Sequence, residues 1–233
     1  MQLKKINIKE NAIRLGADKC GIASVDRFKD APAGFKPTDV YGKCKSVIVF
    51  LKSMPSEIIL AENPVPYSNA ASLIYSEVDK IGMELTRHLQ KNNIKAVPIP
   101  CDTPYLHWDS EELYGRGILS MRHAALNAGL GILGKNTLLI NQDFGNMVYI
   151  GAVLVDLDLE PDPMVTDFNC PAKCNRCLIS CPQKALNGTT VNQKLCRQIA
   201  IAKLGRGFDV YVCNKCRKSC PYRSGYGRRP IVH

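Results

Sequence analysis

The stretch CPAKCNRCLISCP (170–182) decides the organisation of the chain, because it places four cysteines within thirteen residues. A second run of the form C-x2-C-x3-C-P begins at Cys213, after the solitary Cys196. Eleven cysteines in 233 residues are poorly explained by disulfides if the protein is kept in a reducing compartment. Closely spaced cysteines of this kind indicate a metal-binding module in the C-terminal part of the chain.

The two runs are similar to those of bacterial two-cluster ferredoxins, although Cys196 stands far from its run and one extra residue separates Cys170 from Cys174. In that pattern the fourth cysteine of each run ligates the other cluster. A proline after the last cysteine turns the chain away from the cluster. We therefore predict two [4Fe-4S] clusters. The first is assigned to Cys170, Cys174, Cys177 and Cys220, and the second to Cys181, Cys196, Cys213 and Cys216.

Zinc is the alternative metal, because two C-x2-C pairs could build a tetrahedral site of four thiolates. Such a site would leave four of these cysteines unused, and it gives no reason for a proline after both Cys181 and Cys220. The other three cysteines, Cys20, Cys44 and Cys101, are scattered along the chain. We interpret them as small buried hydrophobic residues.

The charge is as uneven as the cysteine distribution. Residues 170–233 hold 13 Lys and Arg and one acidic residue, whereas residues 1–169 hold 18 basic and 20 acidic residues. Two clusters with four thiolates each carry roughly −2 apiece, which offsets only part of the basic excess. The remainder indicates a solvated surface or a negatively charged partner, such as an acidic ferredoxin or flavodoxin that donates electrons. RNA binding by the tail SGYGRRPIVH (224–233) is a further hypothesis.

An acidic, proline-containing stretch, DLDLEPDPMVTD (156–167), precedes the cysteines. We place a boundary there, between a core domain (1–165) and a two-cluster domain (166–233). No apolar run approaches the ~18 residues that a spanning helix needs. The N-terminal MQLKKINIKENAIR also lacks the apolar segment of a secretory signal. We therefore expect a cytoplasmic protein without a membrane segment.

Hydrophobic periodicity predicts an α+β core with a mixed sheet, because helices and strands do not alternate strictly. Residues 53–68 carry three prolines and are predicted to form a loop, and NQDFGN (141–146) a hairpin-like turn between two strands. Helices are expected over 4–16, 69–91 and 120–128, and strands over 20–25, 46–51, 94–99, 137–140 and 147–155.

The segment GLGILGKN (129–136) matches G-x-G-x-x-G and nearly matches the Walker A pattern. Both motifs require a strand before the loop and a helix after it, whereas here the predicted order is reversed. We therefore interpret the segment as a tight connection from a helix to a strand. Its three glycines would allow the backbone to pass close to a flat or bulky group.

Together with the cysteine module, HAALNAGLGILGKNTLLINQDFG (123–145) resembles the epoxyqueuosine reductase family and, more distantly, the catalytic core of reductive dehalogenases. The resemblance implies a core like that of nitroreductases and B12-processing proteins, followed by a ferredoxin-like double [4Fe-4S] module. It also implies a cobalamin that receives electrons from the clusters and reduces the substrate, which is a small molecule or tRNA. The residues that would contact the cobalamin are Gly129, Gly131, Gly134, Lys135 and Asn136.

Two features differ from the family pattern. Epoxyqueuosine reductases carry a catalytic aspartate in a D-S/T-x-P-type segment, and a count without gaps from the glycine loop reaches Gly115 instead. The chain also ends soon after the second cysteine run, where many members continue with helical repeats. These differences predict a short, divergent member.

The irregular segment PYLHWDSEELYGRGILS (104–120) is rich in aromatic and acidic residues, as a pocket wall would be. A surface loop with its aromatic side chains packed beneath it is the alternative. Candidate proton donors are Tyr105, Asp109, Glu111 and Tyr114. The predicted function is a reductase that passes single electrons through two clusters to a corrinoid or small substrate. An electron-transfer protein that docks a partner enzyme, without catalysis of its own, is the alternative.

Overall fold

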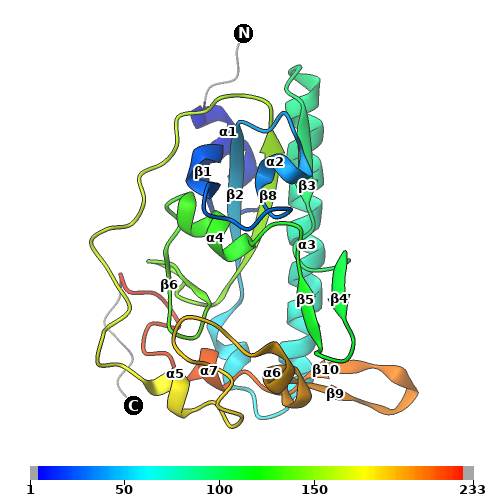
Figure 1. Cartoon of the computed structure of the whole chain (residues 1–233), viewed down its shortest axis with the longest axis vertical. Coiled ribbons are helices and arrows are strands. Elements are labelled where there is room, and N and C mark those ends of the chain that lie inside the picture. The colour runs from blue at the N-terminus through cyan, green and yellow to red at the C-terminus, as the bar shows by residue number, and fades with distance from the viewer. Residues whose placement is uncertain (1–4, 228–233) are drawn as a thin grey trace.

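The computed structural model describes residues 5–227 (Figure 1). A four-stranded sheet in the order β1-β2-β8-β3 forms the core. Strands β1 and β2 pair antiparallel, and β8 pairs antiparallel with β2 on one side and β3 on the other. The predicted α+β class is confirmed, but the sheet is antiparallel rather than mixed, because all neighbouring strands run in opposite directions. The strands are β1 (Lys19–Ser24), β2 (Ser46–Ser53), β3 (Ala96–Ile99) and β8 (Val148–Val155).

Helices cover both faces of this sheet. Alternating residues of β2 point to opposite sides, so that Phe50 faces one hydrophobic cluster and Val49 the other. Helices α1 (Lys5–Arg14) and α3 (Pro64–Lys91) cover the Phe50 side, and α4 (Met121–Asn127) covers the opposite side. Gly151 is required in β8, since a Cβ there would lie 2.2 Å from the Phe50 ring. The core is thus a three-layer arrangement.

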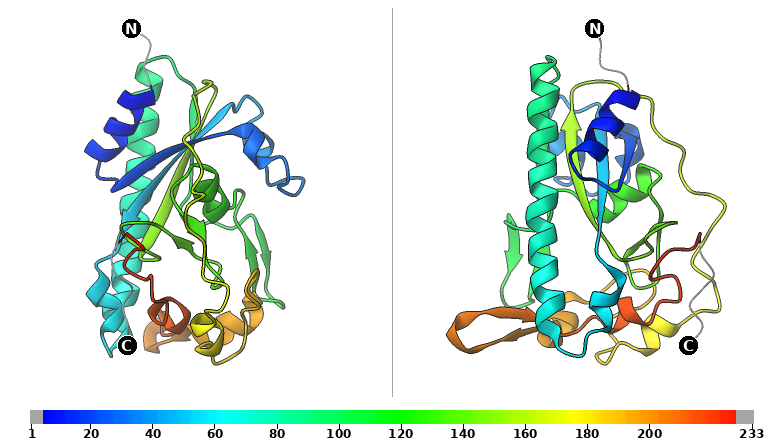
Figure 2. Two further views of the ribbon diagram at one scale, coloured as in Figure 1. Left: turned by 90° about the vertical axis from the view of Figure 1, so that its left-hand side faces the viewer. Right: turned by 180° about the vertical axis from the view of Figure 1, so that it is seen from behind.

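Helix α3 begins at Pro64, five residues before the predicted start, and the predicted loop over 53–68 is therefore wrong in its last part. The Asn63 side chain accepts a hydrogen bond from the backbone N–H of Val65, and proline suits the first helical turn because it lacks an N–H to satisfy. The helix has 28 residues and a length of about 42 Å. Its N-terminal end therefore reaches beyond the sheet to the cysteine module (Figure 2).

The predicted turn at NQDFGN is present, since the backbones of Asn141 and Gly145 exchange two hydrogen bonds, but the strands on either side of it do not pair with each other. Strand β7 (Leu139–Ile140) pairs with β6 (Ile132–Leu133), whereas β8 joins the central sheet. The Asn141 side chain accepts hydrogen bonds from two backbone N–H groups of the turn and donates one to the carbonyl of Leu130. The glycine loop between α4 and β7 thus forms a small hairpin with itself, and the expected order of helix, loop and strand is confirmed.

After β8 an extended segment (156–170) leads to the cysteine module at the lower end of the molecule in Figure 1. Among the described residues, no helix is long and apolar enough to cross a membrane. The module contains α5 (Arg176–Ile179), α6 (Gln193–Ala200), β9 (Ile201–Lys203), β10 (Asp209–Tyr211) and α7 (Lys215–Lys218). The remaining short elements are 3-10 turns at Val25–Phe28, Ser56–Leu60 and Gly205–Gly207, helix α2 (Pro37–Val40), and strands β4 (His107–Asp109) and β5 (Tyr114–Arg116).

Candidate functional site

One group of cysteine thiols gathers around Cys220. Burial, together with the thiols of Cys170, Cys177 and Cys174, raises the pKa of the Cys220 thiol to about 11. The pKa of Cys177 is also raised by burial and by the thiols of Cys170 and Cys174. These mutual effects place the four cysteines of the first predicted set near one another.

A second group gathers around Cys216. Burial, together with the thiols of Cys196, Cys213 and Cys181, raises the pKa of this thiol to about 11 against the lowering effect of Arg217. Burial likewise raises the pKa of Cys196, next to the thiols of Cys213 and Cys181. No pKa shift of these thiols involves a cysteine of the other set. The influences on these four thiols thus run within each predicted set, and the assignment of the eight cysteines to two clusters stays a prediction.

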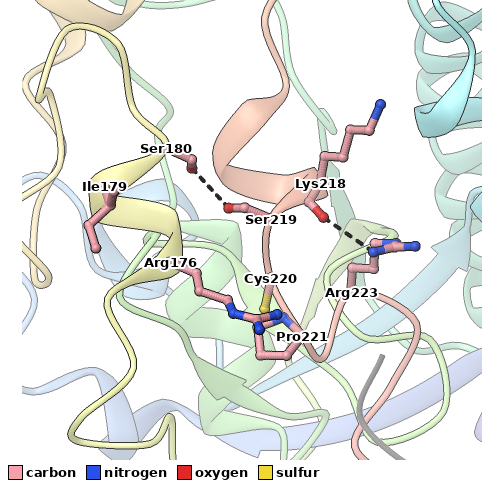
Figure 3. A pocket seen from close by; sticks show the side chains of 8 residues that line it. All are labelled: Arg176, Ile179, Ser180, Lys218, Ser219, Cys220, Pro221 and Arg223. Atoms are coloured by element: carbon pink, nitrogen blue, oxygen red, sulfur yellow. Dashed lines mark hydrogen bonds between the residues drawn. The ribbon is translucent and has the colours of Figure 1, made fainter. Parts of the chain in front are cut away.

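A repeated motif explains how each loop contributes a cysteine to the other group. Residues 174–182 and 213–221 both read C-N-[KR]-C-x-x-S-C-P, and each forms a four-residue helix that starts after the asparagine. The Oγ atoms of Ser180 and Ser219 lie 2.9 Å apart, so the two helices meet at equivalent serines (Figure 3). Each serine directly precedes the last cysteine of its run. The contact therefore brings Cys181 and Cys220 to the neighbouring loop.

Within 5–227, no three His, Cys, Asp or Glu side chains converge closely enough to hold a single metal ion. The remaining cysteines differ in their surroundings. Cys20 and Cys44 are buried in the core, as predicted, and Cys101 is half-buried against it.

The glycine loop contacts the cysteine module. The Lys135 ammonium donates hydrogen bonds to the carbonyl oxygens of Ala172 (2.6 Å) and Cys174 (3.0 Å), and the Asn136 side chain donates one to the carbonyl of Cys216. A Cβ at Gly129 would lie 2.1 Å from the carbonyl oxygen of Pro163. A Cβ added at Gly131 would be too close to Ile140, and one added at Gly134 would be too close to Ile140 and Asn136. These five residues, predicted as possible cobalamin contacts, thus hold parts of the chain together.

The acidic and aromatic segment forms a hairpin, β4–β5, that docks on α6. Gln193 of α6 exchanges two hydrogen bonds of 3.0 Å with the backbone of Gly115, and Lys194 forms an ion pair with Glu112. Three of the four candidate proton donors are exposed on this hairpin. Asp109 accepts hydrogen bonds from the backbone N–H groups of Glu111 and Glu112, and the Tyr114 hydroxyl accepts one from Arg116.

The fourth candidate, Tyr105, is half-buried and donates a hydrogen bond of 2.6 Å to the carboxylate of Asp102. Burial and the neighbouring Asp102 carboxylate together raise the pKa of Tyr105 to about 12. Asp102 also raises the pKa of Tyr75 and Tyr211, after the larger effect of burial. Asp102 is not among the predicted proton donors, because a count without gaps ignores the hairpin that follows it. The residues Asp102-Thr103-Pro104, which are similar to the family's D-S/T-x-P-type segment, could have indicated it.

A tyrosine cluster, which includes Tyr75, Tyr149 and Tyr211, lies between the Asp102 carboxylate and the cysteine module. The rings of Tyr75 and Tyr149 meet edge to face, and the Arg217 guanidinium lies 5.5 Å from the Tyr149 ring centre. Two buried polar atoms there have no hydrogen-bond partner, namely Oδ1 of Asn146 and Nη1 of Arg217. The Asn146 side chain donates to the Arg217 carbonyl. The junction between core and module therefore contains unsatisfied donor and acceptor groups.

On the outer side of the module, a pocket of about 330 Å³ opens at Cys220 (Figure 3). Exposed Arg176 and Lys218 contribute to its wall, and the side chain of Ile179 beside them is 82% exposed. The pocket thus combines positive charge, an exposed apolar side chain and a thiol of the first set.

The C-terminal tail is described only as far as residue 227, so Arg228 and Arg229 of the RNA-binding hypothesis lie outside the described residues. Tyr226 stacks on Phe168 with ring centres 3.9 Å apart. This ring is therefore engaged within the chain.

No family model matches the sequence. The epoxyqueuosine reductase of Bacillus anthracis is 32% identical over 91% of this chain and 62% of its own length. That of Lactococcus garvieae is 34% identical over 43% of this chain and 31% of its own length. The chain thus spans less than two thirds of the curated relatives it matches.

Solved structures show the same fold. Epoxyqueuosine reductase from Streptococcus thermophilus superposes with a TM-score of 0.68 at 22% identity, covering all of this chain and 69% of that one. Another epoxyqueuosine reductase, bound to an epoxyqueuosine-modified tRNA stem loop, gives 0.65 at 20% identity over 98% of this chain and 66% of its own. A catabolic reductive dehalogenase gives 0.69 at 20% identity over 97% and 32% of the two chains. The resemblance to epoxyqueuosine reductases, and in fold to reductive dehalogenases, is therefore confirmed.

Proposed function

We propose that the chain is an iron–sulfur oxidoreductase that carries single electrons through two [4Fe-4S] clusters to an acceptor at the junction of core and module. The observation that supports the proposal is that the influences on the thiols of Cys177 and Cys220, and on those of Cys196 and Cys216, come from cysteines of the same predicted set. Eight thiolates satisfy two cubanes, whereas one zinc site would use four. The named relatives are reductases, which favours the same class of chemistry here.

Anaerobic reconstitution with iron and sulfide tests the cluster count. We expect about eight irons and eight sulfides per chain, with visible absorption typical of [4Fe-4S] clusters. Replacing Cys177 by alanine should remove about half of the iron, and Cys216→Ala should remove the other half. Cys44→Ala serves as the control, because Cys44 is buried in the core away from both sets. Binding of zinc without sulfide would contradict the proposal.

Asp102 and Tyr105 are the proposed proton donors for the reduction. They are joined by a 2.6 Å hydrogen bond, and Asp102 lies close enough to Tyr75 and Tyr211 to affect their pKa. Asp102-Thr103-Pro104 also matches the family's D-S/T-x-P-type segment, with the proline one residue early. A related structure from Bacillus subtilis is described with its catalytic aspartate loop swung out of the active site.

This assignment is tested with a reduced holoprotein and an epoxyqueuosine tRNA stem loop, the ligand of one structural neighbour. Asp102→Asn should slow turnover roughly 10²–10⁴-fold without changing iron content. Asp109→Asn, on the exposed hairpin, should have little effect. Slow turnover in Asp109→Asn with normal turnover in Asp102→Asn would assign the proton donor to Asp109. A wild-type protein that does not turn over the stem loop would exclude this substrate.

A corrinoid is a candidate acceptor, since one structural neighbour is described in terms of B12-dependent dehalogenation. When bound, it would supply a cobalt centre that accepts electrons singly. The glycine loop does not fit such a group, because its residues contact the chain itself. The unpartnered Oδ1 of Asn146 does fit, since a corrinoid carboxamide can donate an N–H to it. Co-elution of cobalamin with the wild-type protein but not with Asn146→Leu would support this fit.

The pocket at Cys220 is the proposed entry point for electrons from an acidic ferredoxin or flavodoxin. Positive charge from Arg176 and Lys218 would steer such a donor, and Ile179 offers it an apolar contact. Reversing both charges (Arg176→Glu with Lys218→Glu) should slow reduction by an acidic flavodoxin about tenfold at low salt. Reduction by dithionite should be unchanged. An equal loss with both reductants would contradict the docking role.

The alternative is an electron-transfer protein that docks a partner enzyme. Exposed apolar side chains at two hairpin regions favour it, since Leu106 is 75% exposed and Phe208 is 66% exposed. Assembled clusters without corrinoid binding or stem-loop turnover would support this alternative.

A further inference from the structure

The β4–β5 hairpin is held on both of its faces. Trp108 lies opposite Gly115 in the register, and the neighbouring pair, His107 and Arg116, points to the other face because side chains alternate along a strand. On that other face, the His107 ring lies 5.1 Å from the Phe35 ring and the Arg116 guanidinium lies 5.4 Å from it. The face that carries Trp108 contacts α6 of the cysteine module instead.

Arg197 of α6 packs against the aromatic side chains of this second face. Its guanidinium carbon lies 4.9 Å from the ring centre of Trp108 and 5.7 Å from that of Tyr105. The rings of Tyr105 and Trp108 are themselves stacked, with centres 6.0 Å apart and planes inclined by 23°. A cation in this position is attracted by the negative face of each ring. Arg197 and the two rings therefore form one packed group across the junction of core and module.

The surroundings of Arg197 restrict it to this position. Its Nη2 atom donates a hydrogen bond of 3.3 Å to Gln193, which lies one helical turn earlier and exchanges two hydrogen bonds with the backbone of Gly115. A Cβ at Gly115 would lie 3.1 Å from the Trp108 ring and 3.4 Å from Nη2 of Arg197. A larger residue at position 115 would therefore displace the ring or the guanidinium.

This packed group ends at the proposed proton donors. The Tyr105 ring carries the hydroxyl that donates a hydrogen bond of 2.6 Å to the Asp102 carboxylate. Burial and Asp102 raise the pKa of Tyr105, and the positive charge of Arg197 acts against this rise. The guanidinium therefore interacts with the hydroxyl end of Tyr105 as well as with its ring.

We propose that Arg197 is a positioning residue for the proton-donating pair, because its packing on the Tyr105 ring fixes the hydroxyl against the Asp102 carboxylate. The inference rests on the proposed function, in which these two groups supply the proton. Arg197 belongs to the module, whereas Tyr105 and Asp102 belong to the core. The proton donor is thus complete only when the module is docked on the core.

Turnover of an epoxyqueuosine tRNA stem loop by the reduced holoprotein tests this role. Arg197→Met should lower kcat about 10- to 100-fold with little change in KM, because a misplaced reacting group slows the reaction without weakening substrate binding. Tyr105→Phe keeps the ring and removes the hydroxyl. The double variant should be no slower than the slower single variant, since Arg197 acts through that hydroxyl. Multiplied losses would overturn the inference.

Arg116→Met is the matched control, because this arginine lies on the opposite face of the same hairpin. It weakens the contact with Phe35 and leaves the packing on Tyr105 in place, so kcat should change by less than about twofold. An equal fall in both arginine variants would overturn the inference, since the rate would then depend on hairpin docking in general.

Trp108 provides a measurement that does not depend on turnover, because it is the only tryptophan in the chain. Acrylamide should quench its fluorescence in the holoprotein about twofold more strongly in Arg197→Met than in the wild type or Arg116→Met, since the guanidinium no longer shields the ring. Wild-type quenching as strong as in the urea-unfolded chain would overturn the inference, even if Arg197→Met failed to fold. A wild-type holoprotein without turnover would refute the proposed reaction, whereas the quenching of Trp108 decides the Arg197 contact separately.

Discussion

The core and the cysteine module are stabilised in different ways. In the core, strands β2 and β8 are almost wholly buried, and two hydrophobic clusters fill the space between sheet and helices. The described part of the module has helices of four to eight residues and few buried apolar side chains, among them Ala185 and Val210. The comparison indicates that apolar burial suffices for the core, whereas the module depends on its ligands and on contacts with the core.

Removal of the proposed clusters should give the largest difference between the two regions. Ligands that bind only the folded state contribute their binding energy to folding, so a chelator should unfold the module. We expect hydrogen exchange of residues 170–227 to lose nearly all protection, while strands β2 and β8 keep theirs. Simultaneous loss of protection in both regions would show that the core is not independently stable.

Phe50→Ala should destabilise the core rather than the cysteine module. The Phe50 ring is 1% exposed and fills the space above Gly151. Truncation of a buried phenylalanine costs about 3–5 kcal/mol, measured here as the free energy of unfolding of the core by urea. Exposed Phe208→Ala is the control and should change it by less than about 0.5 kcal/mol. Equal effects of the two variants would contradict the assigned packing.

Lys135→Met should loosen the link between the regions. The ammonium donates to two backbone carbonyls of the first cysteine loop, and hydrogen bonds from charged groups contribute roughly 1.5–3 kcal/mol. We expect faster iron release to a chelator and weaker hydrogen-exchange protection over 170–177. Lys173→Met, an exposed lysine in the same loop, should leave both rates unchanged. An unaltered release rate in Lys135→Met would mean that the loop is held by other contacts.

Ser219→Ala should have the smallest effect of the four. It removes the hydroxyl that meets Ser180 between α5 and α7, and a neutral hydrogen bond contributes about 0.5–1.5 kcal/mol. The resistance of the holoprotein to urea should fall by that amount. The double variant with Ser180→Ala should cost little more than either single variant, because both break the same bond. Additive losses would indicate that the serines act separately.

Patterns of local origin were predicted correctly. The division of the cysteines into two sets, which follows the two-cluster ferredoxin pattern, stays a prediction. Helix α4 was correctly placed by its apolar periodicity and by Gly129 after its end. Helix α3 was placed only in part, because prolines at its start were interpreted as a loop signal although proline is favoured in a first turn.

Features that depend on distant partners were missed. The pairing of β8 with both β2 and β3 cannot be inferred from its apolar run, because periodicity does not identify a neighbour. The same applies to Asp102, whose significance comes from its contact with Tyr105 and its closeness to Tyr75 and Tyr211. Nothing in the spacing of Lys135 shows that its charge would be used by carbonyls 37 and 39 residues away.

The amino-acid sequence by itself determined which residues could act as ligands and where the apolar segments lie, because both follow from residue type and short-range spacing. The tertiary structure decided which polar groups are buried together, including the placement of Arg217 beside a tyrosine cluster without a carboxylate. The physical reason is that the energy of a buried charge depends on its surroundings, and in this chain those surroundings come from segments far apart in sequence.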